Sequence, residues 1–266
     1  ARFASELGFE VERGTLEAAR ACAAGLADIS PERIREELDR ILLSDAKYGI
    51  PGGPYRGLEL LDNLEALDVI LPELAKGRGV AQKPQYHKYD VLHHCFHAVD
   101  CIEPSLTLRL AALLHDVGKP ACFTVDDQGV GHFYGHPKVS ASLAEDICRR
   151  LRMDKRTAHE IVTLVQWHDR DIPRTEKAIA RAVHQLGEDT FRRLLAIKRA
   201  DNLAQHPDYR GRLTEIDRAG AILDGLLAKQ ACFSLRDLAV NGGDLLALGL
   251  RGPAVGHTLN ALLEQV

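Results

Sequence analysis

A histidine and an aspartate stand side by side at His115 and Asp116, directly after a largely apolar run at 108–114. The pair offers a neutral imidazole nitrogen and a hard carboxylate oxygen from one short piece of backbone. Divalent metal ions that must also hold water are bound by such mixed nitrogen and oxygen ligands. We therefore expect His115 and Asp116 to bind a divalent metal ion, and Asp116 to take part in catalysis.

Further histidines and aspartates stand at intervals on both sides of this pair, and seven of the twelve histidines lie between His87 and His136. A helical hairpin that turns at Glu103-Pro104 would bring His94 back beside the pair. Asp201 lies on a helix otherwise rich in Leu and Ala, where a buried carboxylate is costly unless it is paired or binds metal. The expected metal ligands are His94, His115, Asp116, His136, His168 and Asp201.

Three or four histidines with two aspartates suit one or two divalent ions and leave positions for water. Asp116 could bridge two ions by giving one oxygen to each. Ions about 3.5–4 Å apart would clamp a phosphate and generate hydroxide at neutral pH. His136 and His168 would complete a second ion or contact only the substrate. The identity of the metal stays open among Mn, Ni, Co, Fe, Mg and Zn.

Three residues near these ligands have weaker claims to the metal. His93 points about 100° away from His94 on the same helix, whereas His97 lies one turn from His94 and could reach the site. Asp169 is expected to orient His168 or to face solvent rather than to bind metal.

Two residues are candidates for contact with the substrate. His87 lies in a loop before the histidine-rich helix, from which it could touch a phosphate. Lys119 follows the His-Asp pair closely and could stabilise phosphoryl charge during catalysis. The alternative for Lys119 is a solvated cation near a helix end.

The elements that must position these residues are mostly helices, as helical spacing of apolar residues, abundant Leu and Ala and only 5% aromatic residues indicate. Ser30 is expected to cap the second helix, and Ser234 and Asn241 the last short ones. Gly118 is expected to end its helix in a left-handed conformation. Helices are expected at about 15–27, 31–44, 55–64, 66–75, 88–101, 105–116, 137–151, 155–169, 175–186, 188–204, 210–228, 234–238, 241–247 and 253–265.

Two interruptions divide the helical pattern. A Gly- and Pro-rich loop covers 48–54, and a connector runs from Lys76 through Pro84. At 122–134, two short β-prone segments flank Asp-Asp-Gln-Gly, which predicts a small β-hairpin. The fold class is therefore all-α with one small hairpin.

The bulk composition is that of a globular protein, with 266 residues, 45% hydrophobic and 27% charged. A net charge of −4 excludes a positive field over the whole molecule, so nucleic acid would need a local basic patch. No apolar run reaches the roughly 18–20 residues that span a bilayer, and no secretory leader is present. Because the first residue is Ala and not Met, we expect the chain to be processed, tagged and cut, or a fragment. We expect a cytoplasmic protein that does not contact membranes.

The six cysteines include no C-x-x-C pair, and we expect reduced, mostly buried thiols. They are Cys22, Cys95, Cys101, Cys122, Cys148 and Cys232.

The layout H…HD…D, with Leu-Leu-His-Asp-Val-Gly-Lys-Pro at 113–120, resembles the HD phosphohydrolase superfamily. The wider sequence is similar to the part of bacterial class II tRNA nucleotidyltransferases, the CCA-adding and poly(A) polymerase-like enzymes, that follows their catalytic head. The motifs that carry this second resemblance lie at 2–9, 31–38, 131–136 and 240–246. The resemblance spans nearly all of the chain.

The resemblance implies a helical neck-like region at 1–83, an HD phosphohydrolase domain at 84–208 and a helical tail at 209–266. It also implies phosphatase, 2′-nucleotidase and 2′,3′-cyclic phosphodiesterase activity for the HD part, and tRNA contact for the tail. The family's nucleotidyl-transfer motifs, a Gly-Ser pair and Asp-x-Asp, are missing, as are its nucleobase-reading Asp and Arg. This chain alone is therefore not expected to add nucleotides to tRNA. Either a head was removed, or the protein is a free-standing descendant.

The first functional hypothesis is a metal-dependent phosphohydrolase that acts on nucleotides or RNA ends. The second is a tRNA-binding neck and body without a head, for which the basic stretches at 149–152, 155–156, 192–193 and 198–199 are candidates, although solvated helix faces explain them as well. A regulatory HD protein that acts on a signalling nucleotide is a third. The oligomeric state stays open, with a homodimer as one option.

Overall fold

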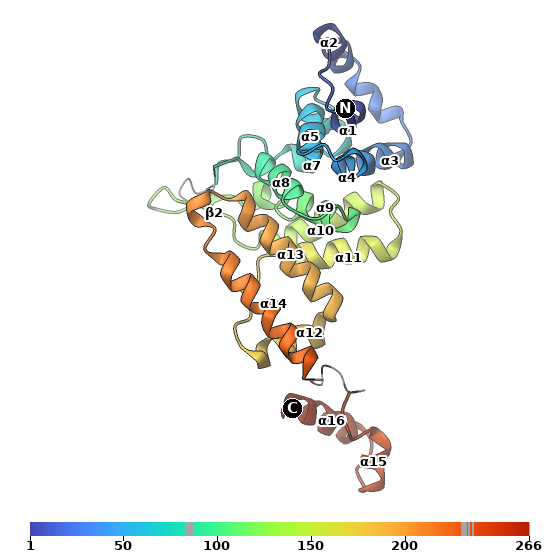
Figure 1. Ribbon diagram of the computed structural model, residues 1–266, viewed down its shortest axis with the longest axis vertical. Coiled ribbons are helices and arrows are strands. Elements are labelled where there is room, and N and C mark those ends of the chain that lie inside the picture. Colours follow the sequence, from blue (N-terminus) through green and yellow to red (C-terminus); the bar gives the residue numbers. More distant parts are fainter. Residues whose placement is uncertain (83–87, 230–232, 234, 236, 266) are drawn as a thin grey trace. The chain divides into compact units, whose positions relative to one another are not determined.

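The computed structural model describes residues 1–82, 88–229, 233, 235 and 237–265. Helices dominate these residues, and the regular β-structure among them is one two-stranded sheet (Figure 1). The prediction of an all-α fold with one small hairpin is therefore confirmed. The chain divides into two units, each described by itself below: Ala1–Arg170 with Arg193–Leu213, and Asp171–Arg192 with Thr214–Val266.

The first unit begins with short helices that pack around α5. Ser30 caps α3 as predicted, because its side chain accepts from the Arg33 N–H. The buried Arg109 joins this part to the next one, since its guanidinium binds the Asp45 carboxylate and the Leu42 carbonyl. The elements are α1 (Arg2–Leu7), α2 (Arg13–Ala21), η1 (Ala23–Asp28), α3 (Pro31–Leu42), α4 (Ser44–Tyr48), α5 (Gly53–Asn63), α6 (Leu67–Ile70) and α7 (Pro72–Ala75).

The predicted helical hairpin is formed by α8 (Val91–Asp100) and α9 (Leu106–Leu114), which pack against each other. Asp90 caps α8 by accepting from the His93 N–H. Every residue of α9 from Leu108 to Leu114 is buried, so the turn that carries His115 and Asp116 emerges from the core. The hairpin thus holds the His-Asp pair in a rigid setting.

Two longer helices follow the hairpin and pack against each other. They are α10 (His136–Arg150) and α11 (Lys155–Trp167), and α11 also contacts α9. Between α9 and α10 lie η2 (Lys119–Cys122) and the predicted β-hairpin, in which β1 (Thr124–Val125) pairs antiparallel with β2 (Gly131–His132). Part of α13 (Glu188–Ala204) and η3 (Pro207–Tyr209) complete the first unit.

The second unit contains α12 (Glu176–Leu186), most of α14 (Arg212–Ala228), α15 (Gly242–Ala247) and α16 (Pro253–Gln265). Asn241 caps α15 as predicted, and its own backbone N–H donates a hydrogen bond to the Asp244 carboxylate. Ser234 lies outside the described residues, as does part of the expected helix at 234–238. No helix of the described part of the chain has the length and apolar character to cross a membrane.

Two local predictions are wrong. Gly118 has φ −84° and not a left-handed conformation, because the chain continues directly into η2. A glycine is needed there for close packing, since a Cβ would lie 2.5 Å from the Ser140 nitrogen and 2.9 Å from the His136 carbonyl oxygen. The cysteines are not mostly buried, because only Cys95 and Cys148 of the five described free thiols are buried. Cys232 lies outside the described residues.

Candidate metal centre

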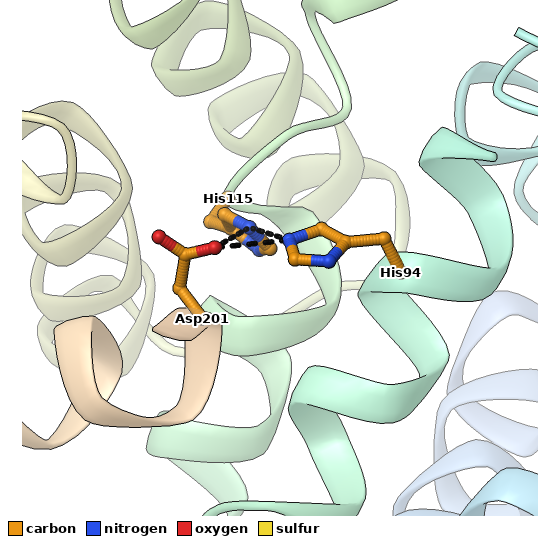
Figure 2. Close-up of side chains that lie close together, drawn as sticks. All are labelled: His94, His115 and Asp201. Atoms are coloured by element: carbon orange, nitrogen blue, oxygen red, sulfur yellow. Dashed lines mark hydrogen bonds and ion pairs between the residues drawn. The ribbon is translucent and has the colours of Figure 1, made fainter. Parts of the chain in front are cut away.

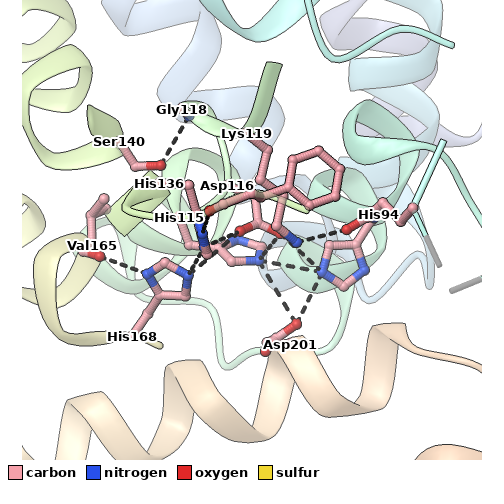
Figure 3. Close-up of polar contacts among 12 residues, drawn as sticks. His94, His115, Asp116, Gly118, Lys119, His136, Ser140, Val165, His168 and Asp201 are labelled. Atoms are coloured by element: carbon pink, nitrogen blue, oxygen red, sulfur yellow. Dashed lines mark hydrogen bonds and ion pairs between the residues drawn. The ribbon is translucent and has the colours of Figure 1, made fainter. Parts of the chain in front are cut away.

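The structure brings together all six residues that the sequence predicts as metal ligands (Figure 3). They come from α8, the turn after α9, the start of α10, the end of α11, and α13, and all lie in the first unit. Their side chains form two groups of three, each with ligand atoms close enough to share one metal ion: His94, His115 and Asp201, and Asp116, His136 and His168.

The first group combines two imidazoles and one carboxylate (Figure 2). His94 Nε2 lies 3.0 Å from Asp201 Oδ1 and 3.3 Å from His115 Nε2. His115 Nε2 lies 3.9 Å from the same Asp201 oxygen. Since His94 and His115 are fully buried, Asp201 provides the more accessible side of the group.

The second group is more deeply enclosed, because Asp116, His136 and His168 are all buried. Asp116 Oδ1 lies 3.3 Å from His136 Nε2 and 3.5 Å from His168 Nε2. The two Nε2 atoms lie 3.3 Å from each other.

Asp116 connects the two groups through its two oxygens. Oδ1 faces the second group, whereas Oδ2 lies 3.1 Å from His115 Nε2 and 3.6 Å from His94 Nε2. Both oxygens are buried, and neither makes a hydrogen bond of ordinary geometry with the described residues. A buried carboxylate without such bonds is costly unless positive charge surrounds it. Lys119 Nζ, 2.6 Å from Oδ2, supplies part of this charge, and the placement of the two oxygens is compatible with a cation in each group.

Three of the four imidazoles are held through their other ring nitrogen. Nδ1 of His115, His136 and His168 faces the carbonyl oxygen three residues earlier, at 2.7, 2.9 and 2.6 Å. A carbonyl only accepts, so each Nδ1 must carry a proton, and Nε2 is the atom that presents a lone pair whenever the ring is neutral. In the second group, two such lone pairs face each other at 3.3 Å. A proton or a cation between them would remove this repulsion, and the donor set is therefore compatible with a divalent metal ion.

Burial and charge act in opposite directions on the Asp116-His115 pair. Burial raises the pKa of Asp116, but His115 and Lys119 outweigh it and hold this pKa well below its usual range. Burial lowers the pKa of His115, but the Asp116 carboxylate outweighs it and raises this pKa well above the ordinary value. The pair is therefore ionised in the chain without metal, and a metal ion bound to His115 must displace a proton.

His168 behaves differently from His115. Burial is the main reason why the pKa of His168 is lowered, and the positive charge at His115 adds to the effect. The imidazole of His168 is therefore neutral at neutral pH, which is the form that binds metal.

Lys119 is not a solvated cation, which corrects that alternative. It is buried, and its Nζ lies 2.6 Å from Asp116 Oδ2. The same Nζ donates a hydrogen bond of 2.6 Å to Gln82 Oε1. Burial lowers the pKa of Lys119, but Asp116 outweighs it and raises this pKa above the ordinary value. The ammonium therefore brings a fixed positive charge to the edge of the site.

The weaker candidates lie away from the two groups. His93 pairs with Asp90 at 2.9 Å. His97 contacts the rings of Tyr55 and Tyr89 in tilted arrangements, with ring centroids 4.5 and 4.0 Å away. Asp169 is exposed and so faces solvent. His87 lies outside the described residues, and its contact with phosphate stays a prediction.

Sequence reasoning missed two buried residues beside the site. Gln82 lies in the predicted connector, where a single glutamine carries no pattern that could reveal it. Lys198 was grouped with the basic surface stretches, yet it is buried and donates to the carbonyl oxygens of His168 and Arg170. Its position three residues before Asp201, one turn along the same helix, could have indicated this role.

Two protein families match the chain. Residues 8–77 match the family described as "Probable RNA and SrmB- binding site of polymerase A", and residues 87–205 match the HD domain. The second match contains all six residues of the two groups.

The curated proteins similar to this chain include enzymes that add nucleotides to tRNA. The "A-adding tRNA nucleotidyltransferase" of Deinococcus radiodurans is 34% identical over 278 aligned residues, which cover 99% of this chain and 62% of that protein. The "CC-adding tRNA nucleotidyltransferase" of Thermus thermophilus is 34% identical, with 99% of this chain and 60% of that protein covered. A "Multifunctional CCA protein" of Thioalkalivibrio sulfidiphilus is 34% identical, with 98% and 62% covered. The chain thus spans about three fifths of the length of these relatives.

Proposed function

Because the chain contains an HD domain and is homologous to bacterial tRNA nucleotidyltransferases over nearly its whole length, we propose that it is a metal-dependent phosphohydrolase of this lineage. The proposed substrates are phosphomonoesters and 2′,3′-cyclic phosphates of nucleotides or RNA ends. One observation carries the proposal: a buried aspartate, Asp116, faces one group of histidine ligands with each of its oxygens. Such an arrangement suits a pair of divalent ions bridged by a carboxylate.

In this proposal, His94, His115 and Asp201 would hold one divalent ion, and His136 and His168 would hold a second. Asp116, whose two oxygens face the two groups, would contribute to both. When bound, the ions would supply Lewis acidity toward a phosphoryl oxygen and a hydroxide nucleophile at neutral pH. The backbone carbonyls behind His115, His136 and His168 fix the orientations of these three rings, so that each presents Nε2 to its ligand group.

Lys119 is the proposed stabiliser of negative charge on the phosphoryl group. Its ammonium is held beside Asp116, and its raised pKa keeps it charged throughout the neutral range. A fixed cation in a site of low water content stabilises charge that develops in the transition state without reorganising at that moment. Lys119 therefore complements the ions without depending on them for its position.

The proposal is tested by metal analysis and by hydrolysis assays on the purified chain. The substrates are 2′,3′-cyclic AMP and p-nitrophenyl phosphate, with and without a chelator. Asp116→Asn is expected to lower kcat/KM by at least about a hundredfold and to reduce bound metal, because it removes the charge shared by both groups. Asp169→Asn is the matched control, since Asp169 is exposed and belongs to neither ligand group, and it should keep the activity. Full metal-dependent activity in Asp116→Asn would refute the assignment.

A second candidate function is binding of tRNA or another RNA, which the match at 8–77 favours. The structure narrows the basic candidates, because several are engaged with acidic groups. Arg150 binds Glu73, and Arg193 binds Glu160. Arg152, Lys155 and Arg156, which also belong to the predicted basic stretches, are exposed and are the candidates retained for contact with RNA. The boundaries 1–83, 84–208 and 209–266 stay part of this proposal.

The RNA proposal is tested with a tRNA transcript and a series of salt concentrations. Contacts to phosphates release counterions, so the affinity should fall steeply as salt rises. The triple variant R152A/K155A/R156A should bind tRNA more weakly and with a smaller dependence on salt. Arg150→Ala is the control, because Arg150 is paired with Glu73, and it should bind tRNA like the wild type. An affinity for tRNA that does not depend on salt would contradict phosphate-mediated binding.

A further inference from the structure

Gln82 is a buried carboxamide beside the metal centre to which the proposed mechanism gives no role. Only 6% of the residue is exposed. Its Oε1 accepts a hydrogen bond of 2.6 Å from Lys119 Nζ. The side chain is therefore fixed at one end by a buried ammonium.

The orientation of this carboxamide follows from the chemistry of its partner. An ammonium has only donors, so the amide atom that faces Lys119 must be the oxygen. The other arm of the amide, Nε2, then carries two N–H donors. Nε2 is buried and has no hydrogen-bond partner among the residues that the structure describes. A buried donor without an acceptor destabilises the fold, so such groups are rare unless a ligand supplies the acceptor.

The position of Gln82 indicates what kind of acceptor a ligand would present to Nε2. Lys119 Nζ lies 2.6 Å from Gln82 Oε1 and also 2.6 Å from Asp116 Oδ2. The carboxamide is thus separated by a single ammonium from the carboxylate that both ligand groups share. An acceptor that reaches Nε2 beside this ammonium and two divalent ions would be favoured if it were an anionic oxygen.

We infer that Gln82 Nε2 donates a hydrogen bond to a phosphoryl oxygen of the ligand held at the metal centre. Gln82 would then have two functions through its two amide arms: Oε1 holds the Lys119 ammonium, and Nε2 binds phosphate. The inference rests on the proposed function, because it requires a phosphate ligand at this centre. It adds a recognition residue that lies outside the metal ligands.

Two substitutions separate these functions. Gln82→Met has a similar length and removes both the acceptor and the donors without adding charge. Gln82→Glu keeps an oxygen for Lys119 but replaces the donor arm with a second oxygen that repels phosphate. Gln185, which is exposed on α12, provides the matched controls Gln185→Met and Gln185→Glu.

The experiment measures binding of inorganic phosphate to the Mn²⁺-loaded chain by isothermal titration calorimetry, with Mn²⁺ affinity and circular dichroism recorded for each variant. Both Gln82 variants should bind phosphate at least about tenfold more weakly, which is roughly 1.4 kcal/mol, while Mn²⁺ affinity and fold stay unchanged. The Gln185 variants should bind phosphate like the wild type.

Three results would overturn the inference. Phosphate binding by Gln82→Glu at the wild-type level would show that Gln82 only holds Lys119. Unchanged binding in both variants would show that Gln82 does not contact the ligand, and loss of Mn²⁺ from either variant would place its role at the metal. If the Mn²⁺-loaded wild type itself does not bind phosphate, the proposed function fails, and that result is distinct from the others.

Discussion

The Lys198 ammonium donates hydrogen bonds to the main-chain carbonyl oxygens of His168 and Arg170, and its Nζ lies 2.5 Å from the His168 oxygen. His168 ends α11 and belongs to the second ligand group, whereas Lys198 lies on α13 one turn before Asp201 of the first group. One buried lysine therefore ties the helix that carries Asp201 to the helix end that carries His168. The two ligand groups are positioned together by this contact as well as by Asp116.

Lys198→Met is expected to lower the free energy of unfolding by about 1.5–3 kcal/mol, because hydrogen bonds from a charged donor to buried carbonyls are lost. It should also weaken metal binding, since the end of α11 loses an anchor. Urea unfolding and metal titration measure the two effects. Lys177→Met, at an exposed position, is the control and should change neither. If Lys198→Met binds metal with wild-type affinity, the hydrogen bond from Lys198 does not position His168 for metal binding.

The close approach of Gly118 to α10 leads to a second prediction. A Cβ at this position would press on the Ser140 nitrogen and the His136 carbonyl, at the beginning of the helix that carries His136. Gly118→Ala is therefore expected to destabilise the fold by about 1–3 kcal/mol and to reduce metal content. Thermal unfolding and elemental analysis test this.

Gly225 provides the control for this substitution. It lies within α14, and nothing lies within 4 Å of a Cβ built there. Gly225→Ala should stabilise the protein by about 0.5–1 kcal/mol, because alanine loses less conformational freedom in a helix. Equal effects of the two substitutions would contradict the packing argument for Gly118.

Much of the helical fold, and the grouping of the six candidate ligands, could be predicted because the relevant patterns are local. Asp201 was recognisable as a polar residue on an otherwise apolar helix, and His94 as a residue that a helical hairpin returns to the His-Asp pair. Both residues are placed by helix periodicity and short turns. The capping residues Ser30 and Asn241 were predictable for the same reason.

The features that could not be predicted depend on contacts between distant segments. Lys119 follows a helix end, where most lysines are solvated, but Gln82 and Asp116 enclose it here. Gly118 suggested a left-handed turn, whereas the real constraint comes from Ser140 on another helix. Such constraints are set by tertiary packing and leave no periodic trace in the sequence.

The separate positions of the two ligand groups predict that substitution of a histidine that belongs to one group removes one ion only. His168→Ala should release the ion of the second group and leave the ion of the first group bound, because His168 makes no contribution to the first group. Elemental analysis after dialysis should show about half of the wild-type metal content. His159→Ala, at an exposed position on the same helix, is the control. Loss of all metal from His168→Ala would indicate a single shared ion.

The burial of His97 predicts a dependence of stability on pH. Burial beside the rings of Tyr55 and Tyr89, with smaller effects of His94, His93 and Lys88, lowers the pKa of His97 to about 4. In the unfolded chain the pKa is about 6.5. Between these values the unfolded chain binds a proton that the folded chain excludes, so the free energy of unfolding must fall as the pH drops through this window.

His97→Phe keeps an aromatic ring beside Tyr55 and Tyr89 but cannot bind a proton. Between pH 7 and pH 5, the metal-free wild type should therefore lose about 1 kcal/mol more stability than His97→Phe, a value reduced from the full pKa difference because the ring is only half-buried. Urea unfolding at both pH values measures the difference. His159→Phe replaces an exposed histidine and should follow the wild type. If His97→Phe and the wild type lose stability in parallel, His97 is protonated in the folded chain, and its burial does not exclude the charge.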